Sequence, residues 1–171
     1  MDKARIYVDL NEMVTEDIAL LSKEDTKMDS QGNIVAFYDG MPVSIYSDDA
    51  SATGETDNLL AEGIAIKYDL KKYPAWKHVK WCVRINWASL MHESDLQFLQ
   101  LLSKEIQKPD KDLLILRECL INFKHHGMDK DSMLENLKKL RTGSDSETEN
   151  VVLDLMDFVV GWCNPNLSIF D

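Results

Sequence analysis

The sequence predicts an α+β protein, with a small bent antiparallel β-sheet or partial barrel in the N-terminal half and antiparallel helices in the C-terminal half. Before residue 90, apolar and polar residues alternate in short stretches separated by turn residues, which is typical of strands. After residue 91, apolar residues recur every three or four positions, which is typical of amphipathic helices. We expect a single α+β domain over residues 1–171, with a β-rich part at 1–90 and a helical part at 91–171.

The clearest strand signal is the run 79–87. Its alternate positions are apolar (Val79, Trp81, Val83, Ile85, Trp87), and the positions between them are mixed and partly basic (Lys80, Cys82, Arg84, Asn86). Successive side chains of a strand point to opposite faces, so one face of this strand should be apolar. We expect that apolar face to be the seam between the sheet and the helices.

Shorter patterns predict the remaining strands, at 6–10, 18–21, 34–38, 41–46 and 63–68. Two turn signals separate some of them, the polar cluster at 29–33 and the dipeptide Asp39-Gly40, from which 41–46 should return. Residues 47–58 have no periodicity, so we expect an exposed loop there. Five or six short strands at this spacing favour a strongly bent sheet.

Four helices are predicted from capping residues and apolar stripes. We expect them to start near Ser94, Asp110, Asp129 and Ser146, each of which can accept a hydrogen bond from a free backbone N–H of the first turn. Pro109, Gly127 and Gly143 should end the first three, and the fourth should end near Pro165. The fourth should bury Val152, Leu155, Val159 and Trp162.

Composition limits the function classes. The net charge of −11 and the pI of about 4.7 argue against direct nucleic-acid binding, which depends on Lys and Arg meeting phosphates. The acidity suits a basic protein partner, or solubility alone. The N-terminus leads directly into a strand pattern and no apolar run approaches the roughly 20 residues that span a bilayer, so we expect neither a signal peptide nor membrane insertion. Three widely spaced cysteines indicate reduced thiols and a cytoplasmic protein.

Motifs for cofactors and metals are not found in the sequence. The four histidines lack His-x-x-x-His spacing, no Cys-x-x-Cys occurs, and the one acidic register around Gly54 places Leu60 where a calcium loop needs Glu. No glycine-rich phosphate loop or Gly-x-Ser-x-Gly elbow is present. We therefore expect no cofactor, no metal and no enzyme activity. A spatially assembled hydrolase or transferase site stays open as an alternative, with His78, His92, Cys82 and Asp69 as its candidates.

Charge is segregated in the β-rich part. Residues 39–62 contain acids without Lys or Arg, and residues 71–84 contain Lys and Arg without acids. The two blocks could neutralise each other across the sheet, since opposed charges on neighbouring strands stabilise a sheet. Alternatively, the acidic loop could face a partner.

The last helix carries a second acidic pattern. Glu147, Asn150, Asp154 and Asp157 share one face at spacings of three and four, opposite the apolar stripe. This face could be simply solvated, Asp154 or Asp157 could pair with Lys or Arg of another helix, or the face could dock a basic protein.

Two segments, 39–57 and 154–165, resemble the small, acidic, cysteine-poor immunity proteins that protect bacteria from their own or neighbouring toxins. This resemblance implies a stoichiometric inhibitor that binds a cationic toxin domain, without catalysis or cofactor. The partner-binding residues would be Asp48, Asp49, Glu55, Asp57, Asp154 and Asp157, and they would occupy basic groups that the toxin uses for substrate phosphates. A third hypothesis is a regulatory or structural subunit whose partner covers Trp76 and residues 71–77.

Overall fold

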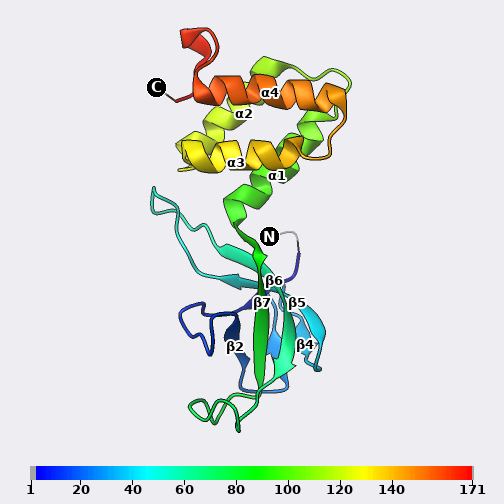
Figure 1. Ribbon diagram of the computed structural model, residues 1–171, viewed down its shortest axis with the longest axis vertical. Helices are drawn as coiled ribbons and strands as arrows, with labels where there is room; N and C mark the ends of the chain where they lie inside the picture. Colours follow the sequence, from blue (N-terminus) through cyan, green and yellow to red (C-terminus); the bar gives the residue numbers. More distant parts are fainter. Residues whose placement is uncertain (1–2, 171) are drawn as a thin grey trace. The chain divides into compact units, whose positions relative to one another are not determined.

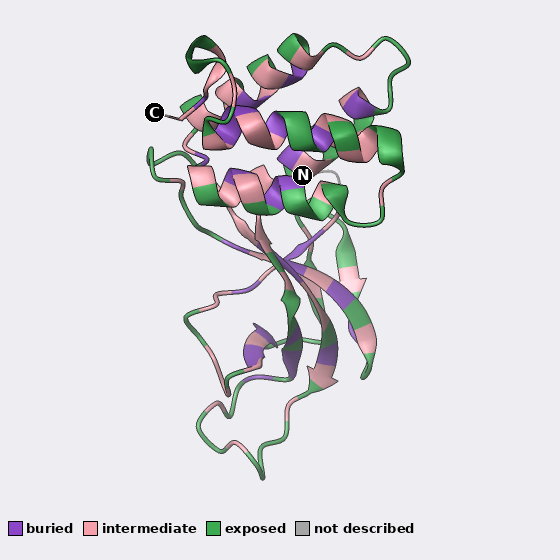
Figure 2. Ribbon diagram, turned by 45° about the horizontal axis from the view of Figure 1, so that its top comes forward, coloured by how far each residue is buried: buried purple, intermediate pink, exposed green. Residues whose placement is uncertain are grey.

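The computed structural model describes residues 3–170 and confirms the α+β class. The chain forms two compact units. The sheet unit comprises residues 1–49 and 57–93, and the helical unit comprises residues 50–56 and 94–171. Each unit has its own buried apolar core, whose residues Figure 2 marks in purple. That the whole chain acts as one domain stays a prediction.

The sheet unit contains a five-stranded sheet curled into a half-barrel (Figure 1). Its strand order is β1-β5-β6-β7-β2, and β1 runs parallel to β5 while the other neighbours are antiparallel. Strands β3 and β4 form a separate two-stranded sheet. The strands are β1 Ile6–Tyr7, β2 Ile18–Ser22, β3 Thr26–Met28, β4 Ile34–Ala36, β5 Met41–Ser47, β6 Leu59–Lys67 and β7 Trp81–His92.

The Asp39-Gly40 turn forms as predicted, with the Met41 N–H donating to the Tyr38 carbonyl and Gly40 at a φ of 84°. The strand that returns from it does not pair with β4, however. β4 pairs with β3 through the hairpin at Asp29–Asn33, and β5 pairs with β6 and β1. Local turn chemistry identified the turn, whereas pairing is decided by which strands share an apolar face.

Strand β7 occupies the centre of the sheet unit, between β6 and β2. Trp81, Val83 and Ile85 are buried on its inner face, in a cluster whose buried members all belong to the sheet unit. The inner face is therefore filled by the sheet unit itself, which corrects the prediction that it would form the seam with the helices. On the opposite face Cys82 is also buried, because a second small cluster that includes Ile18 and Val79 covers it.

The apolar alternation of β7 ends at Ile85. Glu62 of β6 is opposite Asn86, but Leu60, two residues earlier, is already opposite Met91, so β7 carries a bulge at residues 87–90. Bulges rotate side chains away from their regular face. Trp87 is consequently 43% exposed instead of buried, and its indole N–H donates to the Glu16 carbonyl at 2.9 Å.

Four helices and a short 3-10 turn make up most of the helical unit: α1 Glu93–Ile106, α2 Leu113–His125, α3 Lys130–Arg141, α4 Ser146–Val160 and η1 Pro165–Leu167. Successive helices α3 and α4 lie side by side and antiparallel (Figure 1). Of the predicted caps, Asp129 is confirmed. α1 begins at Glu93, and α2 and α4 are capped by Asp112 and Asp145, so Ser94, Asp110 and Ser146 are not the caps.

Candidate protein-binding surface

Helix α4 presents one buried and one exposed face. The Asp145 carboxylate caps its start by accepting from the Thr148 N–H at 2.8 Å, and Gly161 ends it in the left-handed conformation at a φ of 86°. Buried Val152, Leu155, Phe158 and Val159 hold the helix in the core of the helical unit. The spacing of three and four that buries these side chains leaves Asp154 exposed and Asp157 half-buried.

The acids of α4 differ in their partners. Near the start of the helix, the Glu147 carboxylate pairs with Lys111, and the Glu149 carboxylate lies 2.8 Å from the Arg141 guanidinium. Asp154 and Asp157, near its end, form no ion pair with any residue between 3 and 170. The two carboxylates share one face of a helix with no cation of the described chain beside them. The interpretation that Asp154 or Asp157 pairs with a Lys or Arg of another helix is therefore wrong for residues 3–170.

An exposed tryptophan follows the same end of α4. Trp162 is 84% exposed, which overturns the prediction that it is buried. The left-handed Gly161 ends the helix before Trp162, so this residue leaves the apolar stripe, although its N–H still donates to the Asp157 carbonyl at 3.0 Å. Ile169 returns to the core instead, where its N–H donates to the Phe158 carbonyl at 2.9 Å.

Leu153 adds a second apolar group on the exposed side, because it lies one helical turn before Asp157 and is 37% exposed. We call Leu153, Asp154, Asp157 and Trp162 the α4 surface. Sequence reasoning found its two carboxylates and missed its two apolar residues. The glycine directly after an apolar helical run was the available signal that the stripe ends before Trp162.

The loop of residues 47–58 is exposed at its tip, as predicted, and is organised by a short bridge between Ala50 and Thr56. The Ser51 N–H donates to the Glu55 carbonyl at 2.8 Å, and the Glu55 side chain is exposed. Asp48 is exposed where the loop leaves β5. Burial, and then the neighbouring Asp48 carboxylate, raise the pKa of Tyr7. Asp48 and Glu55 thus remain accessible to a partner.

The base of this loop is engaged within the sheet unit. The Asp57 carboxylate is only 12% exposed and lies 3.6 Å from Nδ1 of His92 at the end of β7. The Asp57 N–H donates to the Asp49 carbonyl at 3.0 Å. Asp57 is therefore placed to join the loop to β7, and most of its side chain is covered. Asp48, Asp49 and Asp57 belong to the sheet unit, whereas Glu55, Asp154 and Asp157 belong to the helical unit.

One interpretation of the sequence was that residues 39–62 and 71–84 neutralise each other across the sheet. The ion pairs of Lys80, Arg84 and Glu62 do not follow that scheme. From the basic block, the Lys80 ammonium lies 2.9 Å from the Asp25 carboxylate, and Arg84 lies 3.7 Å from Asp17. From the acidic block, Glu62 pairs with Lys3 and Arg5. The ion-pair partners of Lys80, Arg84 and Glu62 therefore all come from segments before residue 26.

The four candidates for a spatially assembled active site lie in three different places of the sheet unit. Cys82 and Asp69 line one pocket of about 240 Å³, and His78 lines another of about 360 Å³ beside Trp76. His92 lies beside Asp57. Burial raises the pKa of the Cys82 thiol to about 11, which keeps it protonated and unreactive at neutral pH.

Within residues 3–170, no group of three or more His, Cys, Asp or Glu side chains is arranged to hold a metal ion. No helix in the same part of the chain combines the length and apolar character needed to cross a membrane. No family model matches the sequence, and no curated protein and no solved structure matches it.

Proposed function

We propose that this chain is an acidic protein-binding protein, an immunity-type inhibitor that occupies the basic surface of a toxin domain through the α4 surface. One observation carries the proposal: two carboxylates that no cation in the described chain balances lie five and eight residues before a tryptophan that is 84% exposed. Tryptophan is enriched among the residues that dominate binding energy at protein interfaces. Carboxylates around it would orient and attract a basic partner.

The charge of the whole chain supports a cationic partner. At a net charge of −11, the field of the protein accelerates its encounter with a basic domain and disfavours association with acidic ones. Asp154 and Asp157 would pair with Lys or Arg side chains that the toxin uses for substrate phosphates, and Trp162 would supply the apolar anchor. Asp48 and Glu55 would contribute long-range attraction.

The test is capture of a basic partner from the native host at physiological salt, followed by calorimetry with the purified partner. We expect Trp162→Ala to weaken binding at least tenfold, which corresponds to about 1.4 kcal/mol or more, as for interface hot spots. We expect Asp154→Asn combined with Asp157→Asn to weaken it and to reduce its dependence on salt. Asp131→Asn removes an exposed carboxylate on α3 and serves as the matched control.

Recovery of no basic protein from the host would count against the proposal. Equal affinities for the α4 variants and the Asp131→Asn control would count against the α4 surface as the contact site. Because Trp162 and Asp154 are exposed and make no core contact, these variants should fold, and circular dichroism spectra should match that of the natural chain.

A further inference from the structure

The pocket of about 240 Å³ in the sheet unit combines an apolar floor with a cationic rim. It opens between strands β2, β6 and β7 and the segment that precedes β7. Ile18, Ile66 and Cys82 supply its floor, one from each strand, and Lys72, Tyr73 and Arg84 line it with longer side chains. It lies in the other unit from the α4 surface, so it can be tested separately from the proposed function.

The floor is neutral and apolar. Ile18 and Cys82 are buried, and they belong to the small cluster that covers this face of β7. The Cys82 thiol stays protonated at neutral pH, so it adds no charge. A floor of this kind favours an apolar group in the ligand, because burial there removes apolar surface from water.

Three cationic residues, Lys67, Lys72 and Arg84, line the pocket. A hydrogen bond with Tyr73 is the main cause that raises the pKa of Lys72, the Asp69 charge raises it further, and the Arg84 charge works to lower it. The Lys72 ammonium also lies 5.1 Å from the centre of the Tyr73 ring. Like charges in proximity repel, and an anion between them would relieve that repulsion.

The two carboxylates nearby, Asp17 and Asp69, balance these cations only in part. Asp17 lies 3.7 Å from Arg84, and both side chains are more than half exposed, which makes the pair weak. The Asp69 carboxylate, which lines the pocket, accepts from the backbone N–H groups of Lys71 and Lys72, at 2.9 and 3.3 Å. Lys67 lines the pocket as well, so three cations face two carboxylates, and the rim keeps a net positive charge on a protein that is acidic as a whole.

We propose that this pocket binds a phosphate monoester carried on a small apolar group. The phosphate oxygens would accept from Arg84 and Lys72, and the apolar group would lie on Ile18, Ile66 and Cys82. Arginine is suited to this role because its planar fork of donors matches phosphate oxygens. The ligand can be a free metabolite or the phosphorylated tyrosine side chain of a protein, since both present an aryl phosphate.

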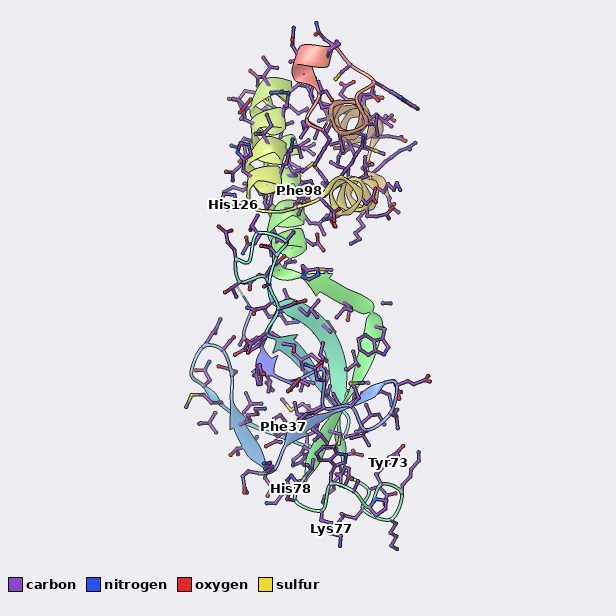
Figure 3. The ribbon with its side chains drawn as sticks, turned by 90° about the vertical axis from the view of Figure 1, so that its left-hand side faces the viewer. Phe37, Tyr73, Lys77, His78, Phe98 and His126 are labelled. Atoms are coloured by element: carbon purple, nitrogen blue, oxygen red, sulfur yellow. The ribbon has the colours of Figure 1, made fainter. Side chains whose placement is uncertain are left out.

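The probe is phenyl phosphate, titrated into isotope-labelled protein while amide chemical shifts are recorded. We expect saturable shifts for residues that line the pocket. Inorganic phosphate lacks the apolar group and phenol lacks the phosphate, so each should bind roughly tenfold more weakly. Arg84→Ala and Lys72→Ala should each abolish saturation. Lys77→Ala is the matched control, because Lys77 lies at the tip of the same segment, apart from Tyr73, as Figure 3 shows.

One variant should strengthen binding. Asp17→Asn removes the carboxylate beside Arg84, and we expect about threefold tighter binding, the size of one screened charge interaction. A structural role for Arg84 alone would not produce this gain. A phosphotyrosine peptide distinguishes the sources: affinity equal to that of phenyl phosphate indicates a protein ligand, and weaker affinity indicates a free metabolite.

Two outcomes would overturn the proposal. The first is the absence of saturable shifts with phenyl phosphate in the natural chain. The second is an equal loss in Lys77→Ala and Arg84→Ala, which would show attraction to a basic loop and no defined site. Neither outcome bears on the α4 surface, whose test uses a different ligand and different variants.

Discussion

The Arg5 guanidinium lies 3.3 Å from the Glu62 carboxylate, and the Arg5 side chain is only 7% exposed. Glu62 also accepts from the Ser44 hydroxyl at 2.7 Å and from the Lys3 ammonium at 3.1 Å. Its backbone N–H donates to the Ser89 hydroxyl in the bulge of β7. Glu62 on β6 thus holds the start of the chain and β5 through its carboxylate, and the bulge through its backbone N–H.

Replacing this carboxylate should destabilise the sheet unit. Glu62→Gln leaves the buried Arg5 charge without a counter-ion, which in a fully buried pair costs about 3–5 kcal/mol. Because the Glu62 side chain is 43% exposed, we expect a smaller loss of about 2 kcal/mol in the free energy of unfolding. Urea unfolding followed by tryptophan fluorescence measures it, since three of the four tryptophans belong to the sheet unit.

The control is Glu24→Gln, which removes an acid that is 76% exposed and pairs with Lys80. An exposed pair contributes about 0–1 kcal/mol, so this variant should unfold almost as the natural chain does. Equal losses in the two variants would contradict the special role of Glu62.

Lowering the pH should remove the contribution of the Glu62 carboxylate to the free energy of unfolding. Burial works to raise the pKa of Glu62, but the hydrogen bonds from Ser44 and Lys3 and the charges of Lys3 and Arg5 lower it overall. A carboxyl whose pKa is lower in the folded state stabilises the protein fully above its unfolded pKa, about 4.3, and loses this effect as pH falls through the folded value. The difference in unfolding free energy between the natural chain and Glu62→Gln should therefore shrink below about pH 4.3. A difference that stays constant down to pH 3 would show that Glu62 acts through shape and not charge.

The Glu62 network marks the limit of what the sequence could predict. Alternation along 79–85 and the helical spacing after residue 91 were sufficient for the fold class, because burial of one face imposes those periods. The approach of Arg5 to Glu62 joins residues that are 57 positions apart, and no local pattern encodes it. The same holds for the bulge at 87–90, which reoriented Trp87, and for the pairing of β5 with β1.

The candidate contact residues also divide into those that a local sequence pattern identifies and those whose partners come from a distant part of the chain. Asp154 and Asp157 were found from helical spacing, since a single helix determines which of its residues share a face. Asp57 was grouped with the loop acids because it lies in the same polar stretch. Its pairing with His92 depends on the end of β7, which local sequence does not place beside it.

Ile169, and not Trp162, lies in the core of the helical unit, and a pair of variants tests this directly. Ile169→Ala removes a side chain that is 5% exposed, and we expect a loss of about 2–4 kcal/mol. Trp162→Ala removes one that is 84% exposed, and the change should stay within about 0.5 kcal/mol. Thermal unfolding followed by far-ultraviolet circular dichroism compares them. A larger loss for Trp162→Ala would mean that Trp162 and not Ile169 belongs to the core.

The contact between the loop 50–56 and the turn at Gly127 can be isolated by a pair of glycine substitutions. Gly127 has a φ of 99°, and a Cβ atom there would lie 3.3 Å from Ser51 and Thr53 side-chain atoms. Gly143 has a φ of 78° with no atom within 4 Å of such a Cβ. Both variants to alanine carry the backbone cost of a left-handed residue, about 1–2 kcal/mol, but only Gly127→Ala also crowds the loop.

We therefore expect Gly127→Ala to lose more stability than Gly143→Ala and to increase proteolytic cleavage within residues 50–56. Limited proteolysis with mass spectrometry locates the cut, and exposed polar loop tips are the segments that proteases cut first. In Gly143→Ala the loop should be cut at the same rate as in the natural chain. Identical cleavage rates in all three proteins would show that Ser51 and Thr53 do not rest on Gly127 in solution. Faster cleavage in Gly127→Ala would show that this contact holds Glu55 in place, because Glu55 lies within the same bridged loop.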